Sequence, residues 1–305
     1  MNLDLDREYS PTLHTKRFQN FDKPNEEVIK NFINVSEKAT LLARQQYKTH
    51  LDVRYGGDND NQLLDIYFKD QEEGTPIFVY IHGGYWQLLD KSTSGPLVFP
   101  MIEHNYRIIL VDYNLCPQVT LEQITQQICN FYKWLQKYAV ETKAPKISIS
   151  GHSAGAHLLL QMFREEFLQP LNRLNLIEEI FLISGVYDLR ELWCLKSVNP
   201  NDILNLNEDK AKELSPLCWL FDKNLLGEYQ KQGLRIHILV AENDSDRFKK
   251  QAREYCEKLK ALKLQTECKE FKAYDHFDII EECVNPKSSI SSYIRENLQC
   301  VKQKF

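Results

Sequence analysis

Two spacings of hydrophobic residues alternate along most of the chain. From residue 76 onward, short continuous apolar runs predict strands buried on both faces, and apolar residues at every third or fourth position predict amphipathic helices. Two earlier strands flank a turn at residues 56–59. The predicted strands cover residues 51–55, 63–68, 76–81, 106–112, 146–150, 180–183, 236–241 and 266–273. The predicted helices cover residues 24–48, 121–138, 154–167, 247–262 and 288–298.

The order of these elements predicts the fold class. Strand and helix alternate from residue 76 to the last helix, which is typical of an α/β fold with a mainly parallel sheet and helices on both faces. Residues 188–232 interrupt the alternation because they contain no predicted strand, and we expect them to form a small cap or lid over the carboxyl edge of the sheet. Residues 1–50 form an N-terminal helical segment ahead of it.

Composition and charge exclude several classes of protein. The chain has 305 residues, 43% of them hydrophobic, and its 38 Lys+Arg against 43 Asp+Glu give a net charge of −5. This is a globular composition, and the acidic balance argues against a nucleic-acid partner. No apolar run approaches the length of a membrane span. Residues 1–6 lack the features of a signal peptide, so we expect a cytosolic protein without a membrane partner.

The eight cysteines carry no metal-binding pattern. They lie at positions without a Cys-x-x-Cys pair and without histidines at zinc-finger spacing. In a large chain with no secretion signal, reduced and mostly buried thiols are the expected state. The sequence therefore predicts neither a metal site nor a disulfide framework.

The strongest chemical motif is Gly-His-Ser-Ala-Gly at residues 151–155. It lies between the predicted strand 146–150 and the helix 154–167, which is the context of a nucleophile elbow. The flanking glycines fit because a side chain at either place would collide with backbone in so tight a turn. The turn places the Ser153 hydroxyl near a helix N-terminus, where negative charge is favoured. We therefore predict that Ser153 is a nucleophile.

A second motif, His-Gly-Gly-Tyr-Trp at residues 82–86, follows the predicted strand 76–81. Acyl transfer builds negative charge on an oxygen, and preorganised backbone N–H groups must point at that oxygen. Glycine allows the backbone to approach closely enough. We predict an oxyanion hole formed by the amides of Gly84 and Tyr85, with Ala154 as a third donor.

A nucleophilic serine needs a base, and the base needs an orienting acid, in the chain order Ser, Asp or Glu, His. His276 follows the last predicted strand and is the candidate base, because His237 lies inside a strand. Three acidic residues follow strand 236–241, namely Glu242, Asp244 and Asp246. We prefer Asp244 at the loop apex, because Asp246 has the position of a helix N-cap. The early histidines do not fit this order, and we expect His82 to brace the oxyanion loop.

The two motifs resemble those of the kynurenine formamidases, also called arylformamidases, a family of α/β-hydrolases similar to the hormone-sensitive-lipase-like esterases. The residues that carry the resemblance are His82-Gly83-Gly84-Tyr85-Trp86 and Gly151-His152-Ser153-Ala154-Gly155-Ala156-His157. The resemblance extends from the Glu-Tyr-Ser-Pro at residues 8–11 to the His276 loop and is weakest in 188–232. It implies the triad Ser153, Asp244 and His276, the oxyanion donors Gly84 and Tyr85, no cofactor and a homodimer.

The resemblance implies hydrolysis of N-formyl-L-kynurenine to L-kynurenine and formate in the kynurenine pathway of tryptophan degradation. Tyr85 and Trp86 lie beside the nucleophile, and they either line a pocket for the kynurenine ring or pack in its wall. A general short-chain carboxylesterase would use the same machinery and is the alternative. A non-enzymatic receptor or adhesion module on this fold is the third hypothesis, which the intact triad positions disfavour.

The positions of these residues also predict the number of domains. Ser153, Asp244 and His276 span the C-terminal half, while Gly84 lies far upstream. All of them must meet at one edge of the sheet, so no domain boundary can fall between them. We expect residues 1–305 to form a single α/β-hydrolase domain.

Overall fold

The computed structural model describes residues 4–57, 61–168, 176–221 and 223–298. Within these residues, eight strands form one sheet in the order β1-β2-β4-β3-β5-β6-β7-β8. The pairs β1–β2 and β2–β4 are antiparallel, and every other pair is parallel. The strands are β1 Lys48–Arg54, β2 Leu63–Phe68, β3 Ile77–Ile81, β4 Arg107–Val111, β5 Ile147–His152, β6 Ile177–Ile183, β7 Arg235–Ala241 and β8 Gln265–Phe271.

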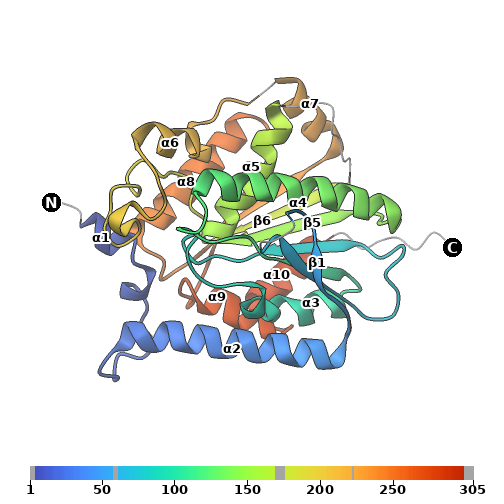
Figure 1. The fold of residues 1–305 in the computed structure, drawn as a ribbon, viewed down its shortest axis with the longest axis horizontal. Coiled ribbons are helices and arrows are strands. Elements are labelled where there is room, and N and C mark those ends of the chain that lie inside the picture. Colours follow the sequence, from blue (N-terminus) through green and yellow to red (C-terminus); the bar gives the residue numbers. More distant parts are fainter. Residues whose placement is uncertain (1–3, 58–60, 169–175, 222, 299–305) are drawn as a thin grey trace.

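Helices cover both faces of this sheet. Helices α4, α5 and α8 lie on one face, and α2, α3, α9 and α10 lie on the other (Figure 1). Each face has its own apolar cluster, because the central strands bury side chains in both directions. The α-helices are α1 Leu5–Glu8, α2 Pro24–Gln46, α3 Val98–Glu103, α4 Leu121–Glu141, α5 Ala154–Leu168, α6 Glu208–Glu213, α7 Lys223–Gln232, α8 Asp246–Ala261, α9 Asp278–Glu281 and α10 Ser289–Asn297.

The structure confirms the predicted fold class, and each predicted strand and helix is present. The helices α1, α3, α6, α7 and α9 were not predicted. Among the predicted elements, the differences lie at element ends. β1 begins at Lys48 rather than Leu51, and its apolar pattern is weak because it is an edge strand that pairs only with β2. α4 continues to Glu141, beyond the predicted end at Tyr138, because Val140 in its last turn faces solvent and breaks the apolar stripe.

The register of the central strands decides where the loops meet. Ile81 at the end of β3 pairs with Gly151 near the end of β5. His152 pairs with Ile183 at the end of β6, and the parallel strands β7 and β8 continue the same edge. The loops that follow β3, β5, β7 and β8 therefore emerge side by side at the carboxyl edge of the sheet.

The segment 188–232 consists of short helices and loops, with no strand among its described residues. Figure 1 shows its first part, in yellow, beside helix α1 at one side of the sheet. Within the described part of the chain, no helix has both the length and the apolar character needed to span a bilayer.

Prediction. Replacing Gly155 with Ala should lower the free energy of unfolding by about 3 kcal/mol, because overpacking of a tight site costs energy. An ideal Cβ there would lie 2.1 Å from the carbonyl oxygen of Ile81 and 2.5 Å from that of His82. The matched control is Gly227→Ala in helix α7, where nothing lies within 4 Å and alanine should add about 0.5–1 kcal/mol. Urea unfolding measures both, and equal effects would contradict the packing argument.

Candidate active site

Ser153 lies on the turn between β5 and α5, in a conformation that serine rarely adopts. Its φ angle is +53°, a left-handed value that costs energy in a residue with a Cβ. The turn is held because the Ser153 N–H donates to the Ile183 carbonyl at 2.9 Å. A Cβ on Gly151 would lie 2.5 Å from the carbonyl oxygen of Gly155, so the flanking glycines are required sterically, as the sequence predicts.

His276 and Asp244 form a buried hydrogen-bonded pair. The two atoms His276 Nδ1 and Asp244 Oδ1 are 2.7 Å apart, and each residue is only 3% exposed. Because a carboxylate can only accept, Nδ1 carries the proton, and Nε2 keeps a lone pair for a proton donor. This is the geometry of a base that a carboxylate orients.

The second oxygen of Asp244 has its own donors. Asp244 Oδ2 accepts from Ser184 Oγ at 2.5 Å and from the Ala241 N–H at 2.9 Å. Burial alone would raise the pKa of Asp244, but the charge of His276 and these hydrogen bonds hold that pKa below its ordinary value. Asp244 therefore stays ionised opposite the imidazole.

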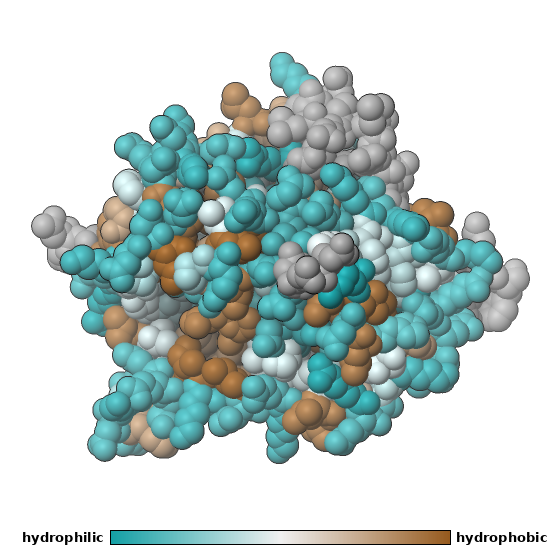
Figure 2. Space-filling view, in the orientation of Figure 1, coloured by the Kyte–Doolittle hydropathy of each residue, from teal (hydrophilic) through white to brown (hydrophobic). Residues whose placement is uncertain are grey.

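Ser153 and His276 open into the same cavity, which has a volume of about 390 Å³. That size is within the range of small-molecule sites. Its lining is mostly apolar, and Figure 2 shows apolar surface beside helix α2, whose Ile29 and Ile33 contribute to the lining. The lining residues are Tyr9, Ser10, Pro11, Thr12, Ile29, Phe32, Ile33, Gly84, Tyr85, Leu88, Leu89, His152, Ser153, Ser197, His276 and Phe277.

The glycine loop, residues 82–88, follows β3 and lies against the serine turn. A Cβ on Gly83 would lie 3.1 Å from the Cβ of Ser153. Gly84 has a φ of +104°, and a Cβ there would lie 2.1 Å from the Leu88 carbonyl oxygen, so only glycine fits. Gly84 and Tyr85 line the cavity, while Ala154 begins helix α5, where first-turn amides have no intrahelical partner.

His82 lies behind this loop. Its ring stacks on Tyr113 with centroids 4.4 Å apart, and its Nδ1 contacts the Gly83 carbonyl at 2.8 Å. The Tyr113 hydroxyl donates to the carbonyl of His82 at 3.0 Å. These contacts place His82 where it can hold the loop rather than react.

Two sequence-based assignments need correction. Trp86 does not contribute to the cavity lining, because its side chain is fully buried in the core and packs edge-to-face on His157 at 5.1 Å. Of the two aromatic residues proposed for substrate binding, only Tyr85 faces the cavity. Asp246 is not the N-cap of α8, because Ser245 caps it by accepting from the Phe248 N–H.

The remaining histidines near the site are held in neutral roles. His152 Nε2 donates to the His276 carbonyl at 2.8 Å, and burial, with the nearby charge of His276, lowers the pKa of His152 to about 3. His157 contacts the Leu214 carbonyl at 2.9 Å, and burial lowers its pKa to about 4. Both imidazoles are therefore neutral near neutral pH.

Several site residues were not predicted from the sequence. Ser184 follows β6 at the same carboxyl edge, and a polar residue directly after a parallel strand was the available signal. Arg17 and Thr15 contact Asp275, which is next to His276, and nothing local in the sequence indicates this. Within the described residues, no cluster of three or more His, Cys, Asp or Glu is arranged to hold a metal ion, and the seven described cysteines are free.

A mainly parallel sheet with a serine turn, a buried His–Asp pair and a glycine loop at one edge defines an α/β-hydrolase. A family model for the alpha/beta hydrolase fold matches residues 78–278. A Silicibacter protein of known structure superimposes with a TM-score of 0.72 at 22% identity, covering 95% of this chain and 98% of its own. Esterase B from Lactobacillus rhamnosis gives a TM-score of 0.65 at 17% identity, covering 89% of this chain and 91% of its own.

Curated proteins of similar sequence indicate one family within the α/β-hydrolases. The chain is 40% identical to the kynurenine formamidase of Drosophila melanogaster over 96% of both chains. It is 30% identical to the kynurenine formamidase of Danio rerio, covering 92% of this chain and 91% of the relative. The chain belongs to the kynurenine formamidase family of the α/β-hydrolases.

Prediction. Replacing Asp278 with Asn should reduce the loss of stability at high pH. Burial and the neighbouring Asp275 raise the pKa of Asp278 from 3.8 to about 7. Between these values the folded chain binds a proton that the unfolded chain lacks, so the free energy of unfolding falls as pH rises through that window. Asn carries no such proton. From pH 5 to pH 8 the wild type should lose about 1–3 kcal/mol more than the variant.

Thermal or urea unfolding at the two pH values measures this difference. The matched control is Asp246→Asn, because Asp246 also begins a helix but its side chain is 90% exposed, so its effect should stay within about 0.5 kcal/mol. If the Asp278→Asn protein shows the same pH dependence of stability as the wild type, the raised pKa of Asp278 is not its cause.

Proposed function

We propose that this chain hydrolyses the formamide of N-formyl-L-kynurenine, giving L-kynurenine and formate in tryptophan degradation. The observation that carries the proposal is that Ser153 and His276 open into one largely apolar cavity, with Asp244 hydrogen-bonded behind the imidazole. Family membership supplies the substrate, since the relatives that the chain matches over nearly its whole length are kynurenine formamidases.

In the first half of the proposed reaction, Ser153 is the nucleophile. Its oxygen attacks the formyl carbon while His276 Nε2 takes the hydroxyl proton. Negative charge builds on the formyl oxygen, which the N–H groups of Gly84, Tyr85 and Ala154 stabilise as an oxyanion hole. Removing one such donor typically costs about 3 kcal/mol. The arylamine is a poor leaving group as an anion, so His276 returns its proton to that nitrogen as the C–N bond breaks.

The second half releases formate from formyl-Ser153 by the same groups. His276 takes a proton from a water molecule, whose oxygen attacks the formyl carbon. The tetrahedral intermediate collapses, the ester bond to Ser153 breaks, and His276 returns the proton to the serine oxygen. Asp244 holds the imidazole in one tautomer and stabilises the imidazolium in both halves. The chemistry of these steps requires no cofactor.

The lining of the cavity supports an aromatic substrate. Phe32, Phe277 and Tyr85 contribute rings, and aromatic walls bury a planar ligand with a favourable geometry. Tyr85 is the substrate-contacting residue that we retain from the sequence-based proposal.

We also infer, from the family resemblance, a homodimer in the cytosol. The free thiols among the described cysteines support a reducing compartment. We retain one α/β-hydrolase domain over residues 1–305 with 188–232 as a cap, because the serine turn, the glycine loop and the His276 loop meet at one edge of a single sheet.

Prediction. Purified protein should convert N-formylkynurenine to kynurenine, measured by the absorbance of the product. Ser153→Ala and His276→Ala should each lower kcat at least about a thousandfold, because members of a triad act as a unit. Asp244→Asn should lower kcat by about 10³–10⁴-fold by favouring the wrong imidazole tautomer. His104→Ala is the matched histidine control, since His104 lies at the end of α3 stacked on Tyr106, and it should leave kcat unchanged.

Nitrophenyl acetate, compared by kcat/KM, separates the alternatives. A protein that hydrolyses this ester but not N-formylkynurenine would be a general carboxylesterase, and the specific proposal would be wrong. Full activity in the Ser153→Ala protein would refute the triad itself.

A further inference from the structure

The N-terminal strap, residues 4–17, forms part of the cavity wall before the chain enters α2. Figure 1 shows it in blue, passing beside the yellow start of the cap segment. Four of its residues, Tyr9 to Thr12, line the cavity. Its first turns are fixed by two carboxylates: Asp6 accepts from the Ser197 N–H at 2.9 Å, and Glu8 accepts from the Arg247 N–H at 3.0 Å.

At its C-terminal end the strap holds the segment that carries His276. Arg17 forms two forked contacts, one with Asp275 (Nε–Oδ2, 2.7 Å; Nη2–Oδ1, 3.1 Å) and one with Glu281 (Nη1–Oε2, 2.7 Å; Nη2–Oε1, 3.2 Å). Thr15 also donates from its hydroxyl to Asp275. Asp275 and Glu281 are buried, so these are charge-assisted bonds in a desolvated place.

Asp275 in turn restrains the backbone around His276. Its Oδ1 atom accepts from the N–H groups of Phe277 at 2.8 Å and Asp278 at 2.9 Å. The residues on both sides of His276 are therefore fixed by one carboxylate that Arg17 orients. Burial alone would raise the pKa of Asp275, but the bonds from Arg17 and Thr15 hold it below its ordinary value.

Removing Arg17 would leave the carboxylates of Asp275, Asp278 and Glu281 close together without the guanidinium that faces all three. Asp275 and Glu281 are buried, and without the guanidinium such carboxylates either repel one another or take up protons, and both changes disturb their shared geometry. The strain would fall on the segment that sets the position of the His276 ring.

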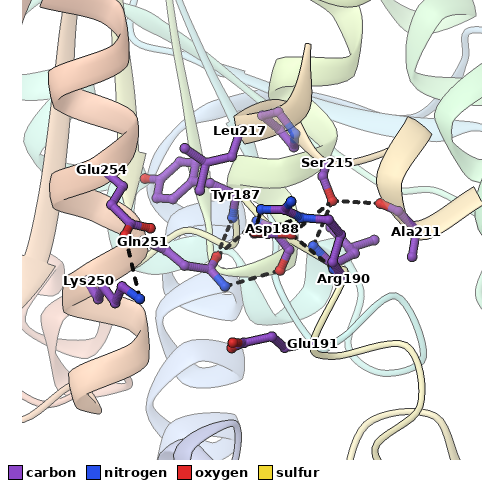
Figure 3. A network of polar contacts seen from close by, with 12 residues as sticks. Tyr187, Asp188, Arg190, Glu191, Ala211, Ser215, Leu217, Lys250, Gln251 and Glu254 are labelled. Atoms are coloured by element: carbon purple, nitrogen blue, oxygen red, sulfur yellow. Dashed lines mark hydrogen bonds and ion pairs between the residues drawn. The ribbon is translucent and has the colours of Figure 1, made fainter. Parts of the chain in front are cut away.

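Midway along its length, at Tyr9, the strap holds the glycine loop. The Tyr85 hydroxyl donates to the Tyr9 carbonyl at 2.7 Å. Tyr9 is itself fixed, because its hydroxyl accepts from Gln251 Nε2 at 2.7 Å. Figure 3 shows the Gln251 side chain directed at the backbone of Tyr187 and Asp188, and its Oε1 accepts from both of their N–H groups. Tyr9 therefore links helix α8 to the loop that carries Tyr85.

We propose that the N-terminal strap positions the two halves of the catalytic site relative to each other, with Arg17 as the positioning residue for His276 and Tyr9 as the anchor for the glycine loop. The proposal rests on the triad proposed above. Arg17 does not line the cavity, so its action is indirect and should change kcat rather than substrate binding. Misplacement of a catalytic group by about 1 Å can cost about a hundredfold.

The test is steady-state kinetics of the full-length Arg17→Ala protein. We expect kcat to fall about 10–100-fold while KM changes less than about threefold. Guanidinium at millimolar concentration should restore part of the lost kcat, because it can occupy the space between Asp275 and Glu281. Arg17→Lys keeps the charge but not the fork, and should lie between Arg17→Ala and the wild type.

Arg235→Ala is the matched control for stability. Arg235 is also a partly exposed arginine that pairs with a buried carboxylate, here Glu179, but it lies at the opposite, amino end of the parallel strands. It should lower the melting temperature without a comparable fall in kcat and without rescue by guanidinium. Equal kcat losses in the two variants would reduce Arg17 to a general stabiliser and overturn the proposal.

Two further results would overturn the proposal for Arg17. A folded Arg17→Ala protein with kcat within about twofold of the wild type would overturn the proposal, as would a change confined to KM. If Arg17→Ala does not fold, Arg17→Lys decides by the same criteria.

Tyr85→Phe tests the contact between the glycine loop and Tyr9, since it removes only the hydroxyl that donates to the Tyr9 carbonyl. We expect a fall in kcat of about three- to tenfold. An unchanged kcat would overturn the role of Tyr9 as an anchor.

The kinetics can be measured on N-formylkynurenine and on nitrophenyl acetate. If the wild type cleaves only the ester, the proposed substrate is wrong, while the Arg17 comparison remains decisive on the ester. If the wild type cleaves both and Arg17→Ala matches it, the function stands and the strap proposal fails.

Discussion

The site depends on a close approach between the backbone of the serine turn and the end of β3. Gly155 has no side chain because the carbonyl oxygens of Ile81 and His82 occupy the space where a Cβ would lie. This contact brings the first turn of α5 against the start of the glycine loop. The left-handed conformation of Ser153 and the position of Gly84 and Tyr85 at the same cavity both depend on it, since a shift of one element would move the other.

The second requirement of the site is an ionised carboxylate beside His276. The hydrogen bonds to the buried Asp244 meet this requirement. Asp244 is buried, yet its two oxygens together accept from His276, Ser184 and the Ala241 N–H. A buried carboxylate without these partners would take up a proton instead of orienting an imidazole. Asp275 follows the same rule on the other side of His276, with Arg17 and Thr15 as its partners. The site is thus built between two buried carboxylates, one that contacts the His276 ring and one that holds its backbone.

The sequence predicts the parts of the site that depend on local geometry. Strand runs such as Ile77–Ile81 are buried on both faces and leave a clear apolar signal. The glycines of the serine turn and of the glycine loop are needed where they stand, so the motifs could be read directly. The triad order then left His276 as the base and three acidic residues as candidates, of which we preferred Asp244 at the loop apex. The structure brings the side chains of Asp244 and His276 together.

The remaining features of the site depend on contacts that no local sequence pattern indicates. Arg17 and Asp275 are 258 residues apart in the chain, and a charged residue in an irregular segment gives no sign of its partner. The motif left Trp86 either lining a substrate pocket or packed in its wall, and the geometry of the loop directs its side chain into the core. Asp246 was read as a cap because serine and aspartate are both good caps, and only the hydrogen bond to Ser245 distinguishes them.

The most direct measurement of the central claim is active-site labelling with a fluorophosphonate during the assay with N-formylkynurenine. The account predicts one adduct per chain, located on Ser153 by peptide mass spectrometry, with formamidase activity lost in proportion to labelling. An adduct on another residue, or full hydrolysis of N-formylkynurenine by chains labelled at Ser153, would contradict it.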